Sequence, residues 1–245
     1  MRVAAIYDIH GNLPALEAVL DEIRGEGVDQ VVVGGDVVPG PMPRESVSAL
    51  LDLSIPVRFI QGNGERDILA LQGGQELTRV PAQFHEVMRW VANQLPPQHL
   101  SEFASWPLTL RINLPGLGDV VFCHATPRDD NELFTRLTPE HRLRPIFEAT
   151  NAALVICGHT HMQFDRRVGG VRVVNAGSVG MPFGDPGAYW ALLGSGLELR
   201  HTPYDLAAAA ERISATEYPQ ASEFDVQRPP PESQMLEVFE AAALR

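Results

Sequence analysis

The stretch VAAIYDIHGN, residues 3–12, decides the fold because an apolar run ends abruptly in polar side chains. Val3–Tyr7 predicts a short buried strand, and Asp8 and His10 follow its carboxyl end two residues apart. Side chains at that spacing leave an extended chain on the same side. Apolar residues then recur at helical spacing from Leu13, so the segment predicts a strand whose polar end leads directly into a helix.

The same arrangement follows twice more along the chain. Gln30–Val33 predicts a strand that turns out through Gly34-Gly35-Asp36, and Val57–Ile60 predicts a third strand that runs into Gly62-Asn63-Gly64. A helix is predicted between them at Ser46–Leu53. In open α/β sheets ligands bind at the carboxyl ends of the strands, so these polar turns indicate a site at that edge.

The second half of the chain changes from a helical to a strand period. Ile68–Trp106 is predicted to be mostly helical, after which Leu108–Leu114 and Val120–Phe122 flank a Pro-Gly-Leu-Gly turn and predict a hairpin. No internal repeat or low-complexity tract indicates an independent second domain. The later predicted elements are helices at Glu140–Thr150 and Glu232–Ala243, and strands at Ala153–Ile156, Val171–Val174, Ala188–Leu193 and Leu197–His201.

The eight histidines fall into two groups. Four have no partner pattern around them and are interpreted as surface or structural residues: His85, His99, His141 and His201. The other four are His10, His124, His159 and His161, and each follows a predicted strand. Cys123 and Cys157 lie in apolar strands and are interpreted as buried core residues in preference to a disulfide or a thiolate ligand.

Seven side chains therefore lie where a predicted strand gives way to a turn. One aspartate or histidine in such a place is usually a turn or structural residue, but seven together are difficult to explain by turn chemistry alone. Imidazoles, carboxylates and an amide oxygen form a suitable ligand set for two transition-metal ions. The seven are Asp8, His10, Asp36, Asn63, His124, His159 and His161.

The charge balance of the 245 residues limits the possible partners. All 19 basic residues are arginine, and the net charge is −12. This balance argues against a general nucleic-acid binder and against a protein that binds anionic membranes, because both need an excess of positive charge. No stretch reaches membrane-spanning length, and the first apolar run is too short for a signal peptide, so a cytoplasmic location is expected.

The motifs Asp8-Ile9-His10-Gly11-Asn12, Gly35-Asp36, Gly62-Asn63, His124 and Gly158-His159-Thr160-His161 resemble those of the calcineurin-like metallophosphoesterase family. The resemblance covers residues 1 to about 190 and is nearest to the family's small bacterial and archaeal phosphodiesterase branch. The run Asn175–Gly180 is similar to a turn of the small bacterial members. It implies an α/β (α+β) fold, in which a two-sheet β-sandwich is flanked by helices in an αββα arrangement. The early strand–helix–strand pattern would then contribute to a mixed sheet.

The resemblance also implies the role of each ligand. Asp8, His10 and His161 would hold a first metal, Asn63, His124 and His159 a second, and Asp36 would bridge the two. The cofactors would be two divalent transition-metal ions, which ligand type alone does not identify as Mn, Fe, Zn, Ni or Co. The expected reaction is attack of a metal-bound hydroxide on phosphorus. Two divalent cations would also make the site locally positive within an acidic protein.

One position departs from the family pattern. Most members carry histidine in the third motif, where this chain has Gly64, so the group that protonates the leaving group is unknown. Glu65 is either a catalytic acid or an N-terminal helix residue favoured by the helix dipole. Asn63 and Arg66 are the candidate substrate-binding residues, although Arg66 could equally be an exposed helix residue. The turn Pro39–Pro43 lines the rim of the site or is a rigid loop before a helix.

These observations predict a phosphodiesterase that acts on a small phosphodiester or nucleotide-like substrate, with no stable nucleic-acid complex and no membrane association. The alternatives are a nucleotide-polyphosphate or protein phosphatase, and a catalytically inactive scaffold with the same fold. Residues 1–228 are predicted to form the metallophosphoesterase domain, with 68–106 and 125–145 as walls of the substrate pocket. Residues 229–245 would form a C-terminal linker and helix.

Overall fold

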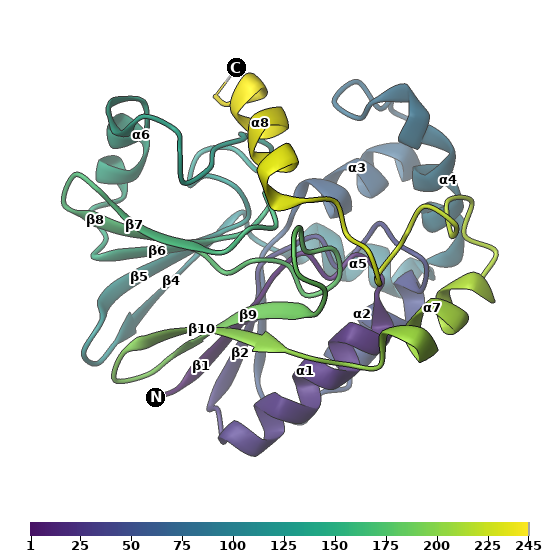
Figure 1. Ribbon diagram of the computed structural model, residues 1–245, viewed down its shortest axis with the longest axis horizontal. Helices are drawn as coiled ribbons and strands as arrows, with labels where there is room; N and C mark the ends of the chain where they lie inside the picture. Colours follow the sequence, from purple (N-terminus) through teal and green to yellow (C-terminus); the bar gives the residue numbers. More distant parts are fainter. Residues whose placement is uncertain (245) are drawn as a thin grey trace.

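The computed structural model describes residues 1–244 and contains two five-stranded sheets (Figure 1). In the first sheet β1, β2 and β3 run parallel, β9 pairs antiparallel with β1, and β10 pairs antiparallel with β9. Its order is β10 (Leu197–Thr202), β9 (Ala188–Leu193), β1 (Val3–Ile6), β2 (Gln30–Val33) and β3 (Val57–Phe59). In the second sheet β5, β6 and β8 run parallel between two antiparallel edges. Its order is β4 (Thr109–Leu114), β5 (Gly118–Cys123), β6 (Leu154–Cys157), β8 (Val171–Asn175) and β7 (Phe164–Val168).

The two sheets pack against each other through one apolar layer. Val3, Ala5 and Tyr7 point from the first sheet into a cluster that also contains Phe122 and Ile156 from the second. Side chains alternate along a strand, so the remaining residues of β1 face the opposite way and enter a second apolar cluster beneath the helices. The predicted two-sheet sandwich with a mixed first sheet is confirmed.

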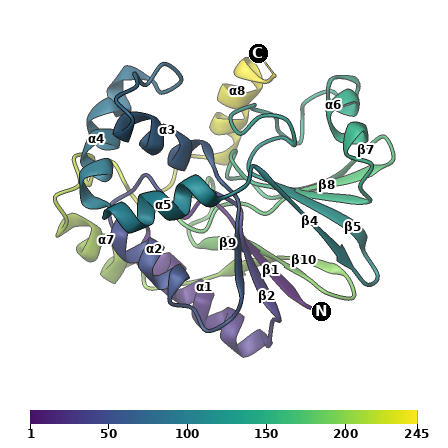
Figure 2. The ribbon, with the colours of Figure 1, turned by 180° about the vertical axis from the view of Figure 1, so that it is seen from behind.

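Helices cover the outer faces of both sheets (Figures 1 and 2). One group of helices lies on the first sheet and one helix lies on the second, while α8 lies between them near the C-terminus. The first group is α1 (Leu13–Glu26), α2 (Pro43–Leu51), α3 (Asn63–Gln72), α4 (His85–Gln94), α5 (Pro97–Ser105) and α7 (Leu206–Ser214), with the short 3₁₀ helix η1 (Ala82–Phe84) before α4. The second sheet is covered by α6 (Glu140–Phe147), which continues into η2 (Glu148–Thr150), and α8 spans Glu232–Ala242.

The first helix begins where its sequence predicts. The Asn12 side chain accepts a hydrogen bond from the Ala15 N–H at 3.2 Å, and Pro14 stands in the first turn, where no N–H is needed. The helix ends at Gly27 in a left-handed conformation. Its apolar residues, among them Leu16, Leu20 and Ile23, are buried against the first sheet.

Two elements lie where the sequence gave no strand or helix prediction. Strand β7 reads FDRRV, and its three central charged residues hide the alternating pattern of an edge strand whose end residues are buried. Helix α7 is rich in alanine, so it carries little apolar periodicity, although Asp205 caps it through the Ala207 and Ala208 N–H groups. The two free cysteines, Cys123 and Cys157, are buried as expected.

The C-terminal helix packs on this chain. Glu240 accepts a hydrogen bond from Thr135 at 2.6 Å, Leu236 is buried, and Arg136 pairs with Glu232. Within residues 1–244 no helix combines the length and apolar character that crossing a membrane requires.

Candidate metal centre

The seven predicted ligands converge at one edge of the sandwich. Asp8 follows β1, Asp36 follows β2, and Asn63 begins α3 just after β3. From the second sheet, His124 follows β5, and His159 and His161 follow β6. The carboxyl ends of parallel strands lie together, so side chains separated by more than 150 residues in the chain become neighbours across the two sheets.

The backbone at this edge is held in an unusual conformation. Five of the seven candidate ligands have positive φ, with values of 50° at Asp8, 47° at His10, 50° at Asp36, 67° at His159 and 58° at His161. Such angles are uncommon for residues other than glycine, and they concentrate at functional sites where surrounding structure enforces them. Elsewhere in residues 1–244 only Asn151 and Leu244 share this conformation among non-glycine residues.

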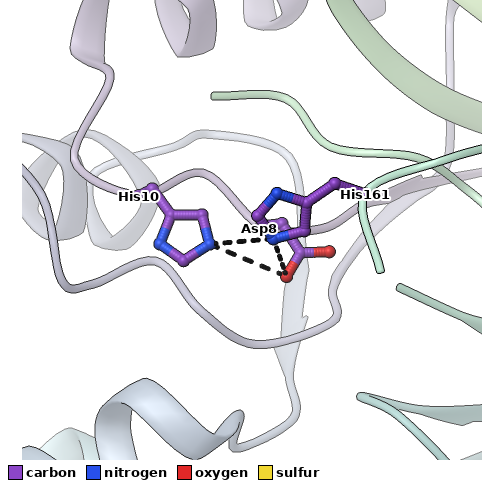
Figure 3. Close-up of side chains that lie close together, drawn as sticks. All are labelled: Asp8, His10 and His161. Atoms are coloured by element: carbon purple, nitrogen blue, oxygen red, sulfur yellow. Dashed lines mark hydrogen bonds and ion pairs between the residues drawn. The ribbon is translucent and has the colours of Figure 1, made fainter. Parts of the chain in front are cut away.

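The first cluster consists of Asp8, His10 and His161, whose side chains point toward one another (Figure 3). The Nε2 atoms of His10 and His161 lie 3.1 Å apart, and Asp8 Oδ1 lies 3.4 Å from His161 Nε2. His10 Nδ1 donates to the Pro39 carbonyl at 3.0 Å, and His161 Nδ1 donates to the Met181 carbonyl at 2.7 Å. These bonds fix the tautomers and leave both Nε2 lone pairs directed at the same point.

The second cluster contains Asp36, His124 and His159, with Asn63 beside them. His124 Nδ1 donates to the Gly34 carbonyl at 2.9 Å, so its Nε2 is an acceptor. That atom lies 3.0 Å from Asn63 Oδ1, 3.2 Å from His159 Nδ1 and 3.6 Å from Asp36 Oδ1. The other Asp36 oxygen lies 3.9 Å from His10 Nε2, so one carboxylate faces both clusters.

The chemistry of these atoms fits bound cations. In the first cluster three acceptors surround one point without a donor among them, and Asp8 Oδ1 is buried with no hydrogen-bond partner in residues 1–244. His159 Nε2 is likewise buried and unpartnered within the described chain. A buried acceptor without a hydrogen-bond donor costs free energy of folding. One cation bound in the first cluster would interact favourably with all three of its acceptors. Imidazole, carboxylate and amide oxygen are ligands that transition metals accept.

Burial sets the protonation of the imidazoles. It lowers the pKa of His10 and of His159 to about 3, so both rings are neutral at pH 7. Burial opposes protonation of His161 as well, but the Asp8 carboxylate outweighs it and raises the His161 pKa. Burial and the nearby Asp8 charge raise the pKa of Asp36 well above its ordinary value. Two buried carboxylates this close to one another require positive charge to remain ionised together.

Glu65 holds the Asp36 loop in place. Its side chain is fully buried and accepts hydrogen bonds from the backbone N–H groups of Asp36 at 3.0 Å, Val38 at 3.2 Å and Gly62 at 2.9 Å. It therefore joins the turn after β2 to the start of α3. Burial, with the Asp36 charge as a smaller cause, raises the pKa of Glu65 to about 7. Glu65 is neither a simple helix-end acid nor part of the cavity lining; it positions a candidate ligand.

The turn Asn175–Gly180 supports the first cluster. Ser178 Oγ donates to the Asp8 carbonyl at 2.7 Å, and the Gly180 N–H donates to the same carbonyl at 3.0 Å. Asn175 Nδ2 donates to the Gly158 carbonyl at 2.7 Å, which secures the turn that carries His159. These hydrogen bonds stabilise the left-handed backbone conformation at Asp8 and His159.

Gly64 occupies a position that is closed to side chains. A Cβ atom there would lie 2.0 Å from the Val38 carbonyl oxygen and 3.0 Å from Asp36 Oδ1. The Gly64 N–H instead donates to Asp36 Oδ1 at 2.7 Å. The absence of the usual histidine is thus built into the packing of the loops around Asp36.

A cavity of about 400 Å³ adjoins the clusters, and His10, Asp36 and Asn63 form part of its lining. The rest of its lining, apart from Pro39, Gly64 and Asp67, is here called the cavity wall: Arg79, Val80, Pro81, Phe84, Val87, Met88, Asn131, Met181, Tyr218, Gln220, Glu223 and Phe224. The two segments predicted as pocket walls, 68–106 and 125–145, supply part of it. Residues 218–224 carry no sequence signal for this role, because nothing in the local sequence indicates that this coil segment lines a cavity beside residues from the first third of the chain.

Arg66 does not line the cavity itself, and its side chain is engaged by two aspartates. Its guanidinium pairs with Asp130 and donates to the two Asp67 oxygens at 3.0 and 3.1 Å. Contact with a substrate phosphate would require these bonds to break. Asn63, the other candidate substrate-binding residue, lines the cavity directly. Pro39 also lines it, whereas α2 begins at Pro43.

A family model, one protein sequence and several solved structures are similar to this chain over most of its length. The model of the calcineurin-like phosphoesterase superfamily domain matches residues 1–194. An uncharacterized protein of Methanocaldococcus jannaschii is 27% identical over 238 residues, which are 89% of this chain and 94% of the relative. The crystal structure of a metallophosphoesterase from Sphaerobacter thermophilus, 26% identical, superposes with a TM-score of 0.71 over 92% of this chain and 99% of that one. A hypothetical protein from Pyrococcus horikoshii OT3 shares the fold, with a TM-score of 0.75, 19% identity and 97% of each chain covered.

Proposed function

The chain belongs to the calcineurin-like phosphoesterase superfamily, and from that membership we propose that it is a two-metal phosphodiesterase acting on a small phosphodiester. The observation that carries the proposal is the convergence of buried acceptors with no donor among them, above all Asp8 Oδ1 beside the Nε2 atoms of His10 and His161. A protein that used this edge only for structure would pair these atoms with one another or with backbone donors.

Asp8, His10 and His161 would hold one ion, Asn63, His124 and His159 the second, and Asp36 would contact both. Divalent cations bound in this way supply Lewis-acid polarisation of a phosphoryl group and a nucleophile from water at neutral pH. The chain's own part is to keep the His10 and His159 imidazoles neutral, to hold two carboxylates close together, and to present Asn63 toward a phosphoryl oxygen in the cavity.

The preference for diesters follows from Gly64. The packing of Val38 against this position leaves no room for a side-chain acid at residue 64. Residue 64 therefore cannot protonate the leaving group. The enzyme would then hydrolyse most readily those esters whose leaving group departs without a proton. It also favours diesters over unactivated monoesters, because a monoester carries more charge to be neutralised as the bond breaks. Most residues that line the cavity are uncharged, and Asp67 and Glu223 are acidic, so a diester with one negative charge would be repelled less than a monoester with two.

Two measurements test this function. Elemental analysis of the purified protein after supplementation with Mn²⁺, Co²⁺ or Zn²⁺ is expected to find two metal equivalents per chain, and no bound transition metal would favour an inactive scaffold. Hydrolysis of bis(4-nitrophenyl) phosphate is then compared with that of 4-nitrophenyl phosphate. A higher kcat/KM for the diester is expected, and a strong preference for the monoester would instead favour a phosphatase.

A further inference from the structure

The cavity beside the clusters is largely apolar, although it opens onto a site for phosphate chemistry. Val87 and Met88 are buried on α4, Phe84 belongs to η1, and Tyr218 and Phe224 come from the coil between α7 and α8. A phosphoryl group and its metal ligands require polar surroundings, so this apolar surface has no role in holding phosphate. Its area must therefore face the organic part of a ligand.

The aromatic rings give that surface a preferred shape of ligand. Tyr218 is held edge-on against Trp90, with ring centroids 5.5 Å apart, and edge-on to Phe224, with centroids 6.2 Å apart. Phe84 lines the cavity and is 41% exposed, which leaves part of its ring uncovered by protein. Uncovered or edge-packed rings of this kind favour a flat aromatic partner over a flexible alkyl chain.

The charges on the cavity wall disfavour a second anionic group. Arg79 is the only guanidinium on the lining, and it is already neutralised because it donates to both Asp129 oxygens at 2.9 and 3.1 Å and lies 3.6 Å from Asp130. Glu223, by contrast, forms no ion pair with any of residues 1–244. The wall therefore offers a free carboxylate and no free cation.

We propose that the cavity wall is the subsite for one ester group of the substrate, and that this group is a flat aromatic ring, such as an aryl group or nucleobase, that is uncharged or positively charged. The subsite deepens the proposed phosphodiesterase function and rests on it for the phosphoryl end of the ligand. A volume of about 400 Å³ accommodates one such group beside a phosphoryl group, and lies in the range of sites for small molecules.

The test measures binding, which does not depend on turnover. Four methyl esters, whose second group is ethyl, phenyl, 4-carboxyphenyl or 4-(aminomethyl)phenyl, are titrated by calorimetry into the full chain supplemented with Mn²⁺. The second group, by which each ester is named, is joined to phosphorus through a methylene in place of the ester oxygen, so that it cannot be cleaved off. The phenyl ester is expected to bind about three- to tenfold more tightly than the ethyl ester. The 4-carboxyphenyl ester is expected to bind about threefold or more weaker than the 4-(aminomethyl)phenyl ester.

Variants locate the preference on the cavity wall. Phe84→Leu should reduce the preference for phenyl over ethyl, and Glu223→Gln should reduce the difference between the two charged rings; both residues are exposed, so the fold should survive. Tyr189→Leu and Glu217→Gln, which lie outside this cavity, are the matched controls and should change neither ratio.

The outcomes separate this proposal from the proposed function. Equal binding of phenyl and ethyl esters, no binding of any of the four, or preferences that Phe84→Leu and Glu223→Gln leave unchanged would each overturn the aromatic subsite. Selective binding of the phenyl ester without hydrolysis of any diester would keep the subsite and contradict the phosphodiesterase.

Discussion

The candidate metal ligands and the cavity wall adjoin the same cavity but come from different parts of the architecture. The ligands follow the carboxyl ends of strands in both sheets, or begin the helix that follows a strand, and Asp8, Asp36 and His124 are buried. The cavity wall comes mostly from helices and coil between elements, and Arg79, Phe84 and Glu223 are exposed. On the proposed function, catalysis would therefore rest on a rigid, strained backbone, while substrate specificity would rest on surface that can vary at little cost to stability.

The largest effect is expected where a ligand that faces both clusters loses its charge. Asp36→Asn should lower kcat for a diester by about 1000-fold or more, because an amide supplies no negative charge to hold two cations together. The metal-free variant should unfold at the same temperature as the metal-free native chain or at a higher one, since a buried carboxylate near Asp8 is removed. Steady-state kinetics and thermal unfolding check both statements, with Phe84→Leu as the contrasting wall variant. Full activity in Asp36→Asn would count heavily against the metal centre, as would full activity in His159→Ala.

A smaller effect is expected from the residue that positions Asp36. Glu65→Gln keeps the size of the side chain. In the native protein three backbone N–H groups donate to the Glu65 carboxylate, and the variant would direct an amide NH₂ at some of them. We expect metal affinity or kcat to fall by about 10- to 100-fold, as is typical for residues that orient a ligand. Glu223→Gln changes the same functional group on the exposed wall and should leave metal affinity unchanged. Equal effects of the two substitutions on metal binding would remove the distinction between the two regions.

The packing at Gly64 predicts that the missing histidine cannot simply be restored. Gly64→His places a Cβ 2.0 Å from the Val38 carbonyl oxygen, so the loop after β2 must shift. A loss of about 1–3 kcal/mol in the free energy of unfolding is expected, measured by urea denaturation, with no gain in monoester hydrolysis. Gly170→His is the control, because a Cβ at Gly170 meets no atom within 4 Å. A stable Gly64→His variant with raised monoesterase activity would show that position 64 is open after all.

The smallest effect concerns a buried histidine outside both regions. Burial, with Arg44 nearby as a lesser cause, lowers the pKa of His99 below its ordinary value of 6.5. As the pH falls below 6.5, the unfolded chain therefore binds a proton before the folded chain does, and stability is lost in that direction. His99→Gln should reduce the decline in unfolding free energy between pH 7.5 and 5.5 by less than about 1 kcal/mol. If the unfolding free energy of metal-free His99→Gln depends on pH just as that of the metal-free native chain does, His99 does not contribute to the loss of stability at low pH.

Most of the fold was predictable because its local signals agree with one another. The strand at Gln30–Val33 and the cap at Asn12 are where the sequence indicates, since apolar pattern and capping chemistry act over a few residues. Strand β7 was not predicted, because an edge strand tolerates the charges of Asp165, Arg166 and Arg167 that a central strand would exclude.

The sequence by itself singled out the candidate ligands, because all seven stand just after a predicted strand and their chemistry is visible in the residue type. Only the tertiary structure decided three other features: that Glu65 holds the Asp36 loop, that Val38 closes position 64, and that Tyr218 reaches a cavity beside residues from the first third of the chain. Contacts of this kind join segments far apart in the chain. They depend on how whole helices and sheets pack, and no local pattern of residues encodes that packing.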